Sequence, residues 1–403
     1  MPEAVIVAAG RSPIGRAFKG SLKDIRPDDL AAQMVGTVLE QVPQLPRGEI
    51  EDVILGCGLP GGEQGFNMAR VVALLSGLPE AGGTTVNRYC SSSLQTIRMA
   101  AHAIRAGEGD AFVAAGVECV SRFVKGNSDS LPDTENPRFE GAKARSAERS
   151  TGESGPWAPN AGLPDIYIAM GQTAENVADY ANVSREEMDQ YALQCQQRTG
   201  KALAEGFFER DITPVALPDG TVVSADDGPR PATTLEDLQK LKPAFRPNGR
   251  VTAGNACPLN DGAAAVVVMS DSRARELGIT PLARVVASAV SALDPEIMGL
   301  GPIEACKRSM ARAGMSIEDI DLVEINEAFA AQIIPSAREL AIDMDKLNVS
   351  GGAIALGHPF GMTGARIMTT LIHNLQDRDR SIGMETMCVG GGQGMSMIVE
   401  RLS

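Results

Sequence analysis

The sequence predicts an α/β protein built from two similar halves. Short apolar runs alternate with helical patterns along the 403 residues, which indicates a central sheet covered by helices on both faces. Residues 49–54 (EIEDVI) are echoed by residues 318–323 (EDIDLV), a separation of roughly 270 residues. So large a separation is typical of a duplicated α/β domain and not of a solenoid. The alternative is that any two βαβ units share such a pattern.

The first half is expected to begin with a buried strand, because residues 5–9 form an apolar run that ends at Gly10. Residues 28–42 have a helical period, and Asp28 or Asp29 is the expected N-cap. The next elements are expected to be a strand at 52–57, a helix at 67–75, a strand at 84–86, a helix between Cys90 and Gly107, and a strand at 110–120.

The middle of the chain has a different character. Residues 125–162 are polar, rich in Gly, Pro, Ser and Glu, and lack a sustained period, so we expect them to run over the surface without regular structure. A helical pattern returns at 165–203, where Ser184 and Glu187 match a capping box. Residues 213–234 are expected to be loop and short strand.

The second half repeats further features of the first. Residues 347–361 echo the strand and turn before Cys90, and residues 382–389 echo residues 111–119. If the duplication is real, the turn that carries Cys90 and the turn that carries His358 are related positions in facing halves. We therefore expect the two turns to meet at one site.

Charge and cysteine usage restrict the possible partners. The chain has 37 Lys and Arg against 51 Asp and Glu, a net charge of −14, which disfavours nucleic acid or an anionic membrane as the main partner. No apolar run approaches the length of a membrane span, and the N-terminus lacks a signal-peptide pattern. The seven cysteines are scattered without a C-x-x-C pair. We expect a cytoplasmic protein with free thiols and no metal site.

Cys90 is a candidate nucleophile because it stands at the predicted start of a helix. There the free backbone N–H groups and the positive end of the helix dipole both favour thiolate over thiol. The alternative is a small buried core residue, which is the commoner fate of a single cysteine.

His358 is the natural base for such a thiol, since it lies in the glycine-dense turn GGAIALGHPFGMTGAR (351–366). His102 and His373 lie inside helical patterns, where a packing or surface role is expected. Asn326 in the sequence INEAF is a further polar group with a possible part in the chemistry.

Cys388 precedes a glycine run, GGGQG, and is a candidate second acid/base. The same glycines leave backbone N–H groups free to stabilise an oxyanion. The competing interpretation of GGGQG is a phosphate cradle, but the run matches neither G-x-G-x-x-G nor a P-loop with its lysine.

Eight stretches in order make the chain resemble the thiolases, which form or cleave 3-oxoacyl-CoA by Claisen chemistry. They cover nearly the whole chain and read AAGRSPIGRAFKGSLKD, GEQGFNMARVVALLSGLP, NRYCSSSLQ, MGQTAEN, TAGNACPLNDGAAA, NEAF, GGAIALGHPFGMTGAR and CVGGGQG. The resemblance implies two βαβαβαββ halves in five α-β-α-β-α layers, with an inserted loop domain that binds CoA. It also implies a homodimer or homotetramer that acts on acyl-CoA and CoA, with CoA as substrate and no other cofactor.

The resemblance also gives expected domain boundaries. They are 1–120 for the first part of the N-terminal half, 121–255 for the inserted CoA-binding loop domain and the return to that half, 256–280 for its end, and 281–403 for the C-terminal half.

By the same resemblance, Cys90 takes the acyl group as a thioester while His358 removes its proton. His358 and a water held by Asn326 would stabilise the thioester enolate oxygen. Cys388 would deprotonate acetyl-CoA or protonate its carbanion, and the backbone N–H groups of Cys90 and Gly390 would form a second oxyanion hole.

The resemblance is less specific for the substrate contacts. Arg230 matches a position near the nucleotide, and Cys257 stands where a serine usually touches the pantetheine arm. Met170, Met298 and Phe329 match the acyl pocket, although each is also consistent with ordinary core.

Departures from the family pattern bear on the acyl group. Ala169 replaces a usual histidine, Ser93 a common glycine, and Glu385 a small apolar residue. These changes leave the chain length and shape of the acyl group open but not the reaction type. We favour degradative cleavage of 3-oxoacyl-CoA, as in fatty acid β-oxidation. The alternatives are acetoacetyl-CoA synthesis from two acetyl-CoA, a ketoacyl synthase, against which Cys388 argues, and a non-catalytic acyl-CoA- or lipid-binding protein.

Overall fold

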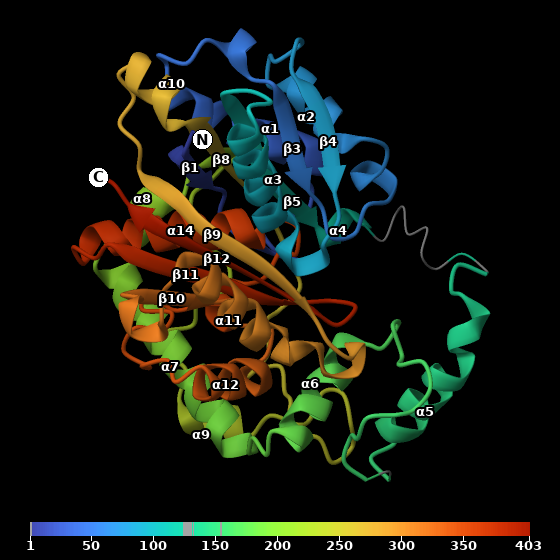
Figure 1. Cartoon of the computed structure of the whole chain (residues 1–403). Coiled ribbons are helices and arrows are strands. Elements are labelled where there is room, and N and C mark those ends of the chain that lie inside the picture. Colours follow the sequence, from blue (N-terminus) through green and yellow to red (C-terminus); the bar gives the residue numbers. More distant parts are fainter. Residues whose placement is uncertain (1, 124–130, 132, 154) are drawn as a thin grey trace.

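The computed structural model describes residues 2–123, 131, 133–153 and 155–403. Within these residues the main sheet has ten strands, nine of which follow one another in the order β10-β11-β12-β9-β1-β8-β5-β3-β4. The sheet divides at the short antiparallel contact between β1 and β9, which joins Val5 and Ile6 to Arg284 and Ala283. Each side of that contact is one half of the molecule (Figure 1).

The N-terminal half contains most of the predicted elements. Its strands are β1 (Ala4–Arg11), the short β2 (Gly15–Arg16), β3 (Asp52–Gly56), β4 (Gly82–Val86), β5 (Ala111–Cys119) and β8 (Asn260–Ser270). Its main helices are α1 (Pro27–Glu40), α2 (Met68–Leu75) and α3 (Ser92–Ala106). Strands β1, β5 and β8 are buried along their whole length, as their continuous apolar sequences predict.

The C-terminal half repeats this arrangement. Its strands are β9 (Ala283–Ala292), β10 (Leu322–Ile325), β11 (Ile382–Val389) and β12 (Gln393–Arg401), and its main helices are α11 (Gly301–Ala313), α12 (Ala330–Glu339) and α14 (Thr363–Asp377). The order β9-β12-β11-β10 matches β1-β8-β5-β3 with the same pattern of parallel and antiparallel pairs. In the N-terminal half β4 pairs in parallel with β3, and at the equivalent place in the C-terminal half Leu347 pairs in parallel with Val323 of β10. The predicted duplication is confirmed.

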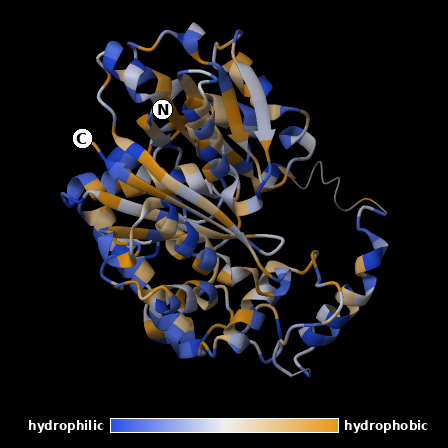
Figure 2. Cartoon of the chain, viewed as in Figure 1, coloured by the Kyte–Doolittle hydropathy of each residue, from blue (hydrophilic) through white to orange (hydrophobic). Residues whose placement is uncertain are grey.

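Three apolar clusters define five layers. One cluster joins α1 and α2 to the outer face of the N-terminal sheet. A second lies between the two sheets and includes α3 and α14. A third joins α11 and α12 to the outer face of the C-terminal sheet. Figure 2 shows apolar residues concentrated on the strands, with hydrophilic residues on the outer helices. The predicted α-β-α-β-α order is confirmed.

The chain between β5 and β8 forms a large insertion, most of which lies over the C-terminal half, while β6 and β7 pack against the N-terminal half (Figure 1). Its helices are α4 (Val120–Phe123), α5 (Glu140–Ser150), α6 (Met170–Tyr180), α7 (Arg185–Ala204), α8 (Phe207–Asp211) and α9 (Leu235–Gln239), and its short strands are β6 (Val215–Ala216) and β7 (Val222–Val223). Residues of α6 and α7 share an apolar cluster with α12, so the insertion completes the core of the second half. Smaller elements elsewhere are α10 (Asp271–Glu276) and α13 (Ala353–Leu356).

The predicted N-cap of the first helix is wrong. Helix α1 begins at Pro27 with Arg26 as its N-cap, because proline fits the first helical position, where no backbone N–H is needed. Asp28 lies in the first turn and accepts hydrogen bonds from Arg26 Nε (3.0 Å) and Arg26 Nη2 (2.8 Å).

The prediction of an irregular excursion at 125–162 is wrong for α5, while residues 124–130, 132 and 154 lie outside the described residues. The helix buries only Ala142 and Ser146, so it has too few buried positions to show an apolar period. The helix predicted at 165–203 is two helices, α6 and α7, and the capping box of Ser184 and Glu187 at the start of α7 is confirmed.

Candidate active site

The first turns of α3 and α14 are in direct contact. The backbone N–H of Ala365 donates to Ser93 Oγ at 2.9 Å. A side chain on Gly364 would meet Leu94 N at 2.3 Å, so glycine is needed where the two helices cross. This contact brings the turn before α3, with Cys90, next to the turn before α14, with His358, as the duplication predicted. The acceptor of this hydrogen bond is the hydroxyl of Ser93, a residue that stands where glycine is common.

Cys90 is held in a tight 3₁₀ turn, Tyr89–Ser91, in which Tyr89 has a positive φ of 43°. The side chain is 9% exposed, and burial raises the pKa of the Cys90 thiol to about 12. The backbone N–H groups of Gly390 and of Cys90 itself favour the thiolate but do not offset burial. The backbone N–H groups therefore act in the expected direction, but burial outweighs them, so Cys90 needs a base.

His358 can act as that base because its tautomer leaves one nitrogen free of hydrogen. Nδ1 lies 2.6 Å from Thr363 Oγ1, and this hydroxyl donates its own hydrogen to Pro359 O at 2.8 Å. The hydroxyl therefore accepts from Nδ1–H, and Nε2 keeps its lone pair. Burial, assisted by the charge of Arg366, lowers the pKa of His358 to about 3, so the ring is neutral in the free protein.

Asn326 directly follows β10 and faces His358. Its Nδ2 lies 3.3 Å from His358 Nε2, while its backbone oxygen accepts from Gln332 Nε2 at 3.1 Å. Asn326 Oδ1 is buried and has no partner among the described residues. An unpartnered buried acceptor is costly, so this oxygen is suited to hold a water or a substrate group.

Cys388 lies one residue before the end of β11 and is fully buried. Burial raises the pKa of its thiol well above the ordinary value, and the nearby Cys90 and Cys257 thiols raise it further. The three thiols therefore lie near one another. Beyond Cys388, Gly391 and Gly392 have φ of 75° and 77°, which only glycine adopts readily, and they let the chain turn back into β12.

A cavity of about 550 Å³ adjoins this cluster. Arg230 and Cys257 line it, and Arg230 is exposed at its edge. Sequence reasoning missed most of the other lining residues, which include Gln196, Leu238, Leu241, Phe245, Gly254 and Ile354. They come from α7, α9, α13 and connecting loops that show no shared pattern in the sequence.

The three predicted acyl-pocket residues have different surroundings. Phe329 is buried, and its ring packs edge-on against that of Phe245 with the ring centroids 6.1 Å apart. Because Phe245 lines the cavity, Phe329 lies behind the cavity wall. Met298 is 2% exposed in the same apolar cluster as Phe329. Met170 is 36% exposed at the first position of α6.

Two buried glutamates were also missed. Glu118, near the end of β5, accepts from the backbone N–H of Gly58 at 2.8 Å and of Gly361 at 2.9 Å, so it ties the loop after His358 to the N-terminal half. Glu327 accepts from Tyr191 Oη at 2.7 Å and from Cys195 Sγ at 2.9 Å. The only signal in the sequence was the position of each acid at the end of a strand.

Family comparison gives the identity of this arrangement. The family model described as thiolase, N-terminal domain, matches residues 4–272, and that described as thiolase, C-terminal domain, matches residues 279–401. The chain belongs to the thiolase family. It is accordingly an acyltransferase.

Similar proteins agree with this assignment. The chain is 45% identical to the 3-oxoadipyl-CoA/3-oxo-5,6-dehydrosuberyl-CoA thiolase of Escherichia coli (strain K12), with 100% of both chains covered. It is 43% identical to a 3-ketoacyl-CoA thiolase of Bacillus subtilis (strain 168), covering 99% of this chain and 100% of the relative. A human mitochondrial 3-ketoacyl-CoA thiolase solved in complex with CoA has a TM-score of 0.86 at 36% identity, covering 100% of this chain and 98% of that one.

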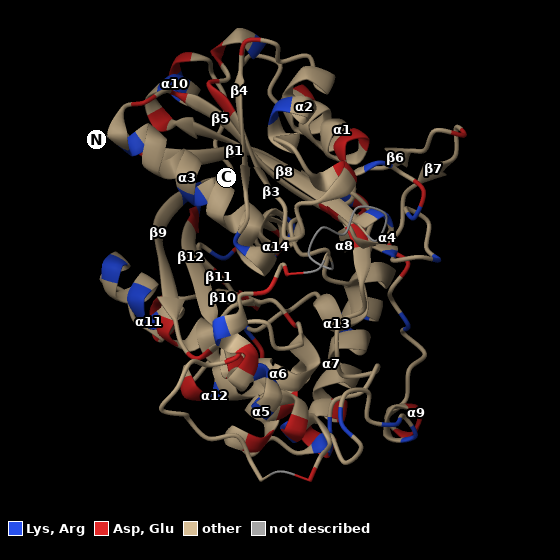
Figure 3. Cartoon of the chain, turned by 90° about the vertical axis from the view of Figure 1, so that its right-hand side faces the viewer, with Lys and Arg blue, Asp and Glu red and all other residues tan. Residues whose placement is uncertain are grey.

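One departure of this thiolase from the family pattern lies in the C-terminal sheet. Figure 3 shows charged residues mostly on outer helices and loops, but Glu385 on β11 is fully buried and both its carboxylate oxygens lack a partner within the described residues. Its neighbour in register on β10 is Glu324, and Arg366 on α14 is also buried. Burial raises the pKa of Glu324 to about 8 and that of Glu385 well above its ordinary value.

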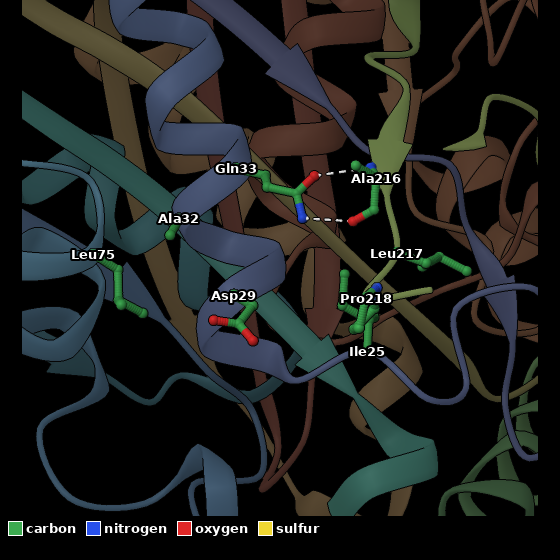
Figure 4. A pocket seen from close by; sticks show the side chains of 8 residues that line it. All are labelled: Ile25, Asp29, Ala32, Gln33, Leu75, Ala216, Leu217 and Pro218. Carbon is green, nitrogen blue, oxygen red and sulfur yellow. Dashed lines mark hydrogen bonds between the residues drawn. The ribbon is translucent and has the colours of Figure 1, made fainter. Parts of the chain in front are cut away.

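A second hollow, of about 470 Å³, lies on the N-terminal half of this thiolase (Figure 4). It is lined by Ile25, Asp29, Ala32, Gln33, Leu75, Ala216, Leu217 and Pro218. The Gln33 side chain makes two hydrogen bonds of 3.0 Å to the backbone of Ala216. The lining has no cysteine or histidine, so this hollow contributes nothing to the catalytic groups.

In the part of the chain that the structure describes, no cluster of three His, Cys, Asp or Glu residues is placed to hold a metal ion. Across the same residues, no helix combines the length and apolar character needed to cross a bilayer.

Proposed function

We propose that this thiolase cleaves 3-oxoacyl-CoA with free CoA, giving acetyl-CoA and an acyl-CoA shortened by two carbons, through an acyl thioester on Cys90. The observation that supports it is the gathering of Cys90, a neutral His358, Asn326 and Cys388 beside a cavity. Every group that the reaction needs is then supplied by this chain.

The first half-reaction breaks the carbon–carbon bond. His358 Nε2 removes the proton from Cys90 as the sulfur attacks the 3-oxo carbon, and the N–H groups of Cys90 and Gly390 bind the resulting oxyanion. Collapse of this intermediate breaks the bond between C2 and C3. Cys388 protonates the acetyl-CoA carbanion, whose enolate oxygen is stabilised by His358 and by a water on Asn326.

The second half-reaction releases the acyl group. Cys388, now a thiolate, takes the proton of the incoming CoA thiol, whose sulfur attacks the thioester on Cys90. The proton on His358 returns to Cys90, which restores the free enzyme. The raised pKa of Cys90 and the lowered pKa of His358 mean that both groups start neutral, so charge develops only during reaction.

We assign CoA to the cavity lined by Arg230 and Cys257. Residues 121–255 form the inserted domain that supplies most of this wall, between the N-terminal half at 1–120 and 256–280 and the C-terminal half at 281–403. The acyl group extends towards Met170, Met298 and Phe329. A structural neighbour in complex with CoA supports the first assignment.

The acyl substrate has two candidates. Relatives named as 3-ketoacyl-CoA thiolases favour unbranched 3-oxoacyl-CoA and a role in fatty acid β-oxidation. The 45% identical relative is named for 3-oxoadipyl-CoA, whose acyl chain ends in a carboxylate. One structural neighbour is an acetyl-CoA acetyltransferase of Bacillus anthracis, at 38% identity, but the names of the curated relatives favour cleavage over acetoacetyl-CoA synthesis.

We also propose a homodimer. Strand β4 is at the edge of the sheet, and its free side would accept a strand from a second copy. Nearby apolar side chains are exposed: Phe66 is 99% exposed, Leu74 55% and Leu75 53%. A homotetramer would need a second contact surface. A cytoplasmic location fits the seven free cysteines, which require a reducing compartment.

The decisive experiment compares kcat/KM for CoA-dependent cleavage of acetoacetyl-CoA, 3-oxohexanoyl-CoA, 3-oxoadipyl-CoA and longer substrates. The two six-carbon substrates differ only in the terminal carboxylate, so their ratio decides between the two candidates. Activity limited to acetoacetyl-CoA would instead support the acetyltransferase alternative. Loss of activity on every substrate would refute the proposal.

A further inference from the structure

We propose that Arg88 and Gln393 are positioning residues that clamp the glycine loop of the C-terminal half (residues 390–392) onto the nucleophile turn of the N-terminal half (Tyr89–Ser91). Arg88 lies two residues before Cys90, and Gln393 lies three residues after Gly390. The inference rests on the proposed roles of Cys90 and Gly390. It concerns how the Gly390 N–H is kept directed at the Cys90 sulfur.

A continuous chain of hydrogen bonds joins the two segments. Arg88 Nη1 donates to Gln393 Oε1 at 2.8 Å, and Gln393 Nε2 donates to the carbonyl of Gly390 at 3.2 Å. On its other side, Arg88 Nε donates to Gln95 Oε1 of α3 at 3.0 Å. The planar guanidinium is thus fixed at two points and connects α3 with the glycine loop.

The loop needs such a restraint because its own residues supply little. Gly391 and Gly392 have the conformational freedom that lets the chain turn, and they have no side chains to hold it in place. Gly390 carries both the carbonyl that Gln393 binds and the N–H that faces Cys90 Sγ. Fixing the carbonyl of Gly390 therefore restricts the orientation of its N–H.

Tyr89 packs on the same residue from the nucleophile turn. A side-chain carbon on Gly390 would lie 3.2 Å from Tyr89 Cδ2, so the ring rests against the glycine backbone. Both residues immediately before Cys90 thus contact the loop. No ion pair to Arg88 is found among the described side chains, and its two partners are neutral amides. The contact therefore fixes the position of the loop through hydrogen-bond geometry and not through pairing of charges.

The test is a double-mutant cycle with Arg88→Ala, Gln393→Ala and the double variant. Each single change should lower kcat about 10-fold, less than the loss of a whole oxyanion-hole donor, with the KM for CoA changed less than about twofold. The double variant should be no worse than either single one, because both break one chain of bonds. Arg88→Lys should recover part of the loss.

A second readout follows Cys90 itself. The pH dependence of its alkylation by iodoacetamide should shift to higher pH in Arg88→Ala and Gln393→Ala, because the Gly390 N–H then stabilises the thiolate less well. Arg98→Ala is the matched control: it removes a nearby arginine of α3 that does not bond to Gln393, and it should leave kcat and the alkylation profile within about twofold.

The outcomes separate this inference from the proposed function. A wild-type enzyme without cleavage activity would refute the function itself. An active wild type, together with losses that add in the double variant or with an unshifted alkylation profile, would refute the clamp. If Arg88→Ala does not fold, Gln393→Ala alone decides, since it leaves the guanidinium and its bond to Gln95 in place.

Discussion

The two halves of this thiolase share one topology but supply different chemistry at equivalent points. The turn before α3 carries Cys90, the proposed nucleophile, and the turn before α14 carries His358, the proposed base. One residue before the end of its strand, β5 has Glu118 where β11 has Cys388. The duplication brings equivalent positions together, and divergence in side chains divides the reaction between them.

The structural residues of one half support the reactive residues of the other. Glu118 does no chemistry in this account, yet it holds Gly361 in the loop that follows His358. Ser93 of α3 likewise accepts from the first turn of α14. The N-terminal half therefore contributes one reactive group and much of the frame, while the C-terminal half contributes the base, the amide and the second thiol.

The largest expected effect is at the nucleophile turn of the N-terminal half. Cys90→Ala should lower kcat more than about 10⁴-fold, because the remaining groups have no atom that can take the acyl group. Mass spectrometry after incubation with acyl-CoA should show no added acyl mass. A retained mass shift would place the nucleophile elsewhere and would contradict the proposal that the N-terminal half supplies it.

A smaller effect is expected at the turn before α14. Thr363→Val removes the hydroxyl that accepts from His358 Nδ1–H, so the ring no longer favours the tautomer with a free Nε2, and kcat should fall about 10-fold. Thr369→Val is the control, since this buried hydroxyl on the same helix bonds only to the Ala365 carbonyl. Equal losses in the two variants would show that Thr363 acts through packing alone.

A third effect concerns the stability of the C-terminal half and not the rate of reaction. Because the folded-state pKa of Glu324 is raised from 4.5 to about 8, the folded protein holds this proton more tightly than the unfolded chain. The stabilisation is complete below pH 4.5 and is lost as pH rises to about 8, by at most about 1.4 kcal/mol per pH unit.

Denaturant unfolding at several pH values checks this expectation. Glu324→Gln should flatten the slope between pH 5 and pH 8, whereas Glu339→Gln, at an exposed position, should leave it unchanged. Glu385→Met should raise the free energy of unfolding by about 1–4 kcal/mol, because an unpartnered buried acid is replaced by an apolar side chain. A destabilised Glu385→Met would mean that the acid has a partner in solution.

The sequence was sufficient to predict the topology and to propose the reactive groups, but not to predict the environment of those groups. Cys90, His358 and Cys388 could be proposed from the sequence because each lies in or next to a tight or glycine-rich turn, which is a local signal. The helix start favours the Cys90 thiolate as expected, but the larger and opposite effect of burial was not predicted, because burial depends on the facing half and not on the neighbouring residues. Phe245 was missed since it reaches the cavity from an irregular loop.

The measurement that tests the division of labour most directly is the separation of the two chemical steps in Cys388→Ser. The account predicts that transfer of an acyl group from acyl-CoA to Cys90 slows at most about 10-fold, because a CoA thiolate can leave without a proton, while cleavage of a 3-oxoacyl-CoA falls about 10²–10⁴-fold. Rapid-quench mass spectrometry of acyl-Cys90, alongside a spectroscopic assay of cleavage, gives both rates. Equal survival or equal loss of the two steps would contradict the assignment of the carbanion proton to Cys388.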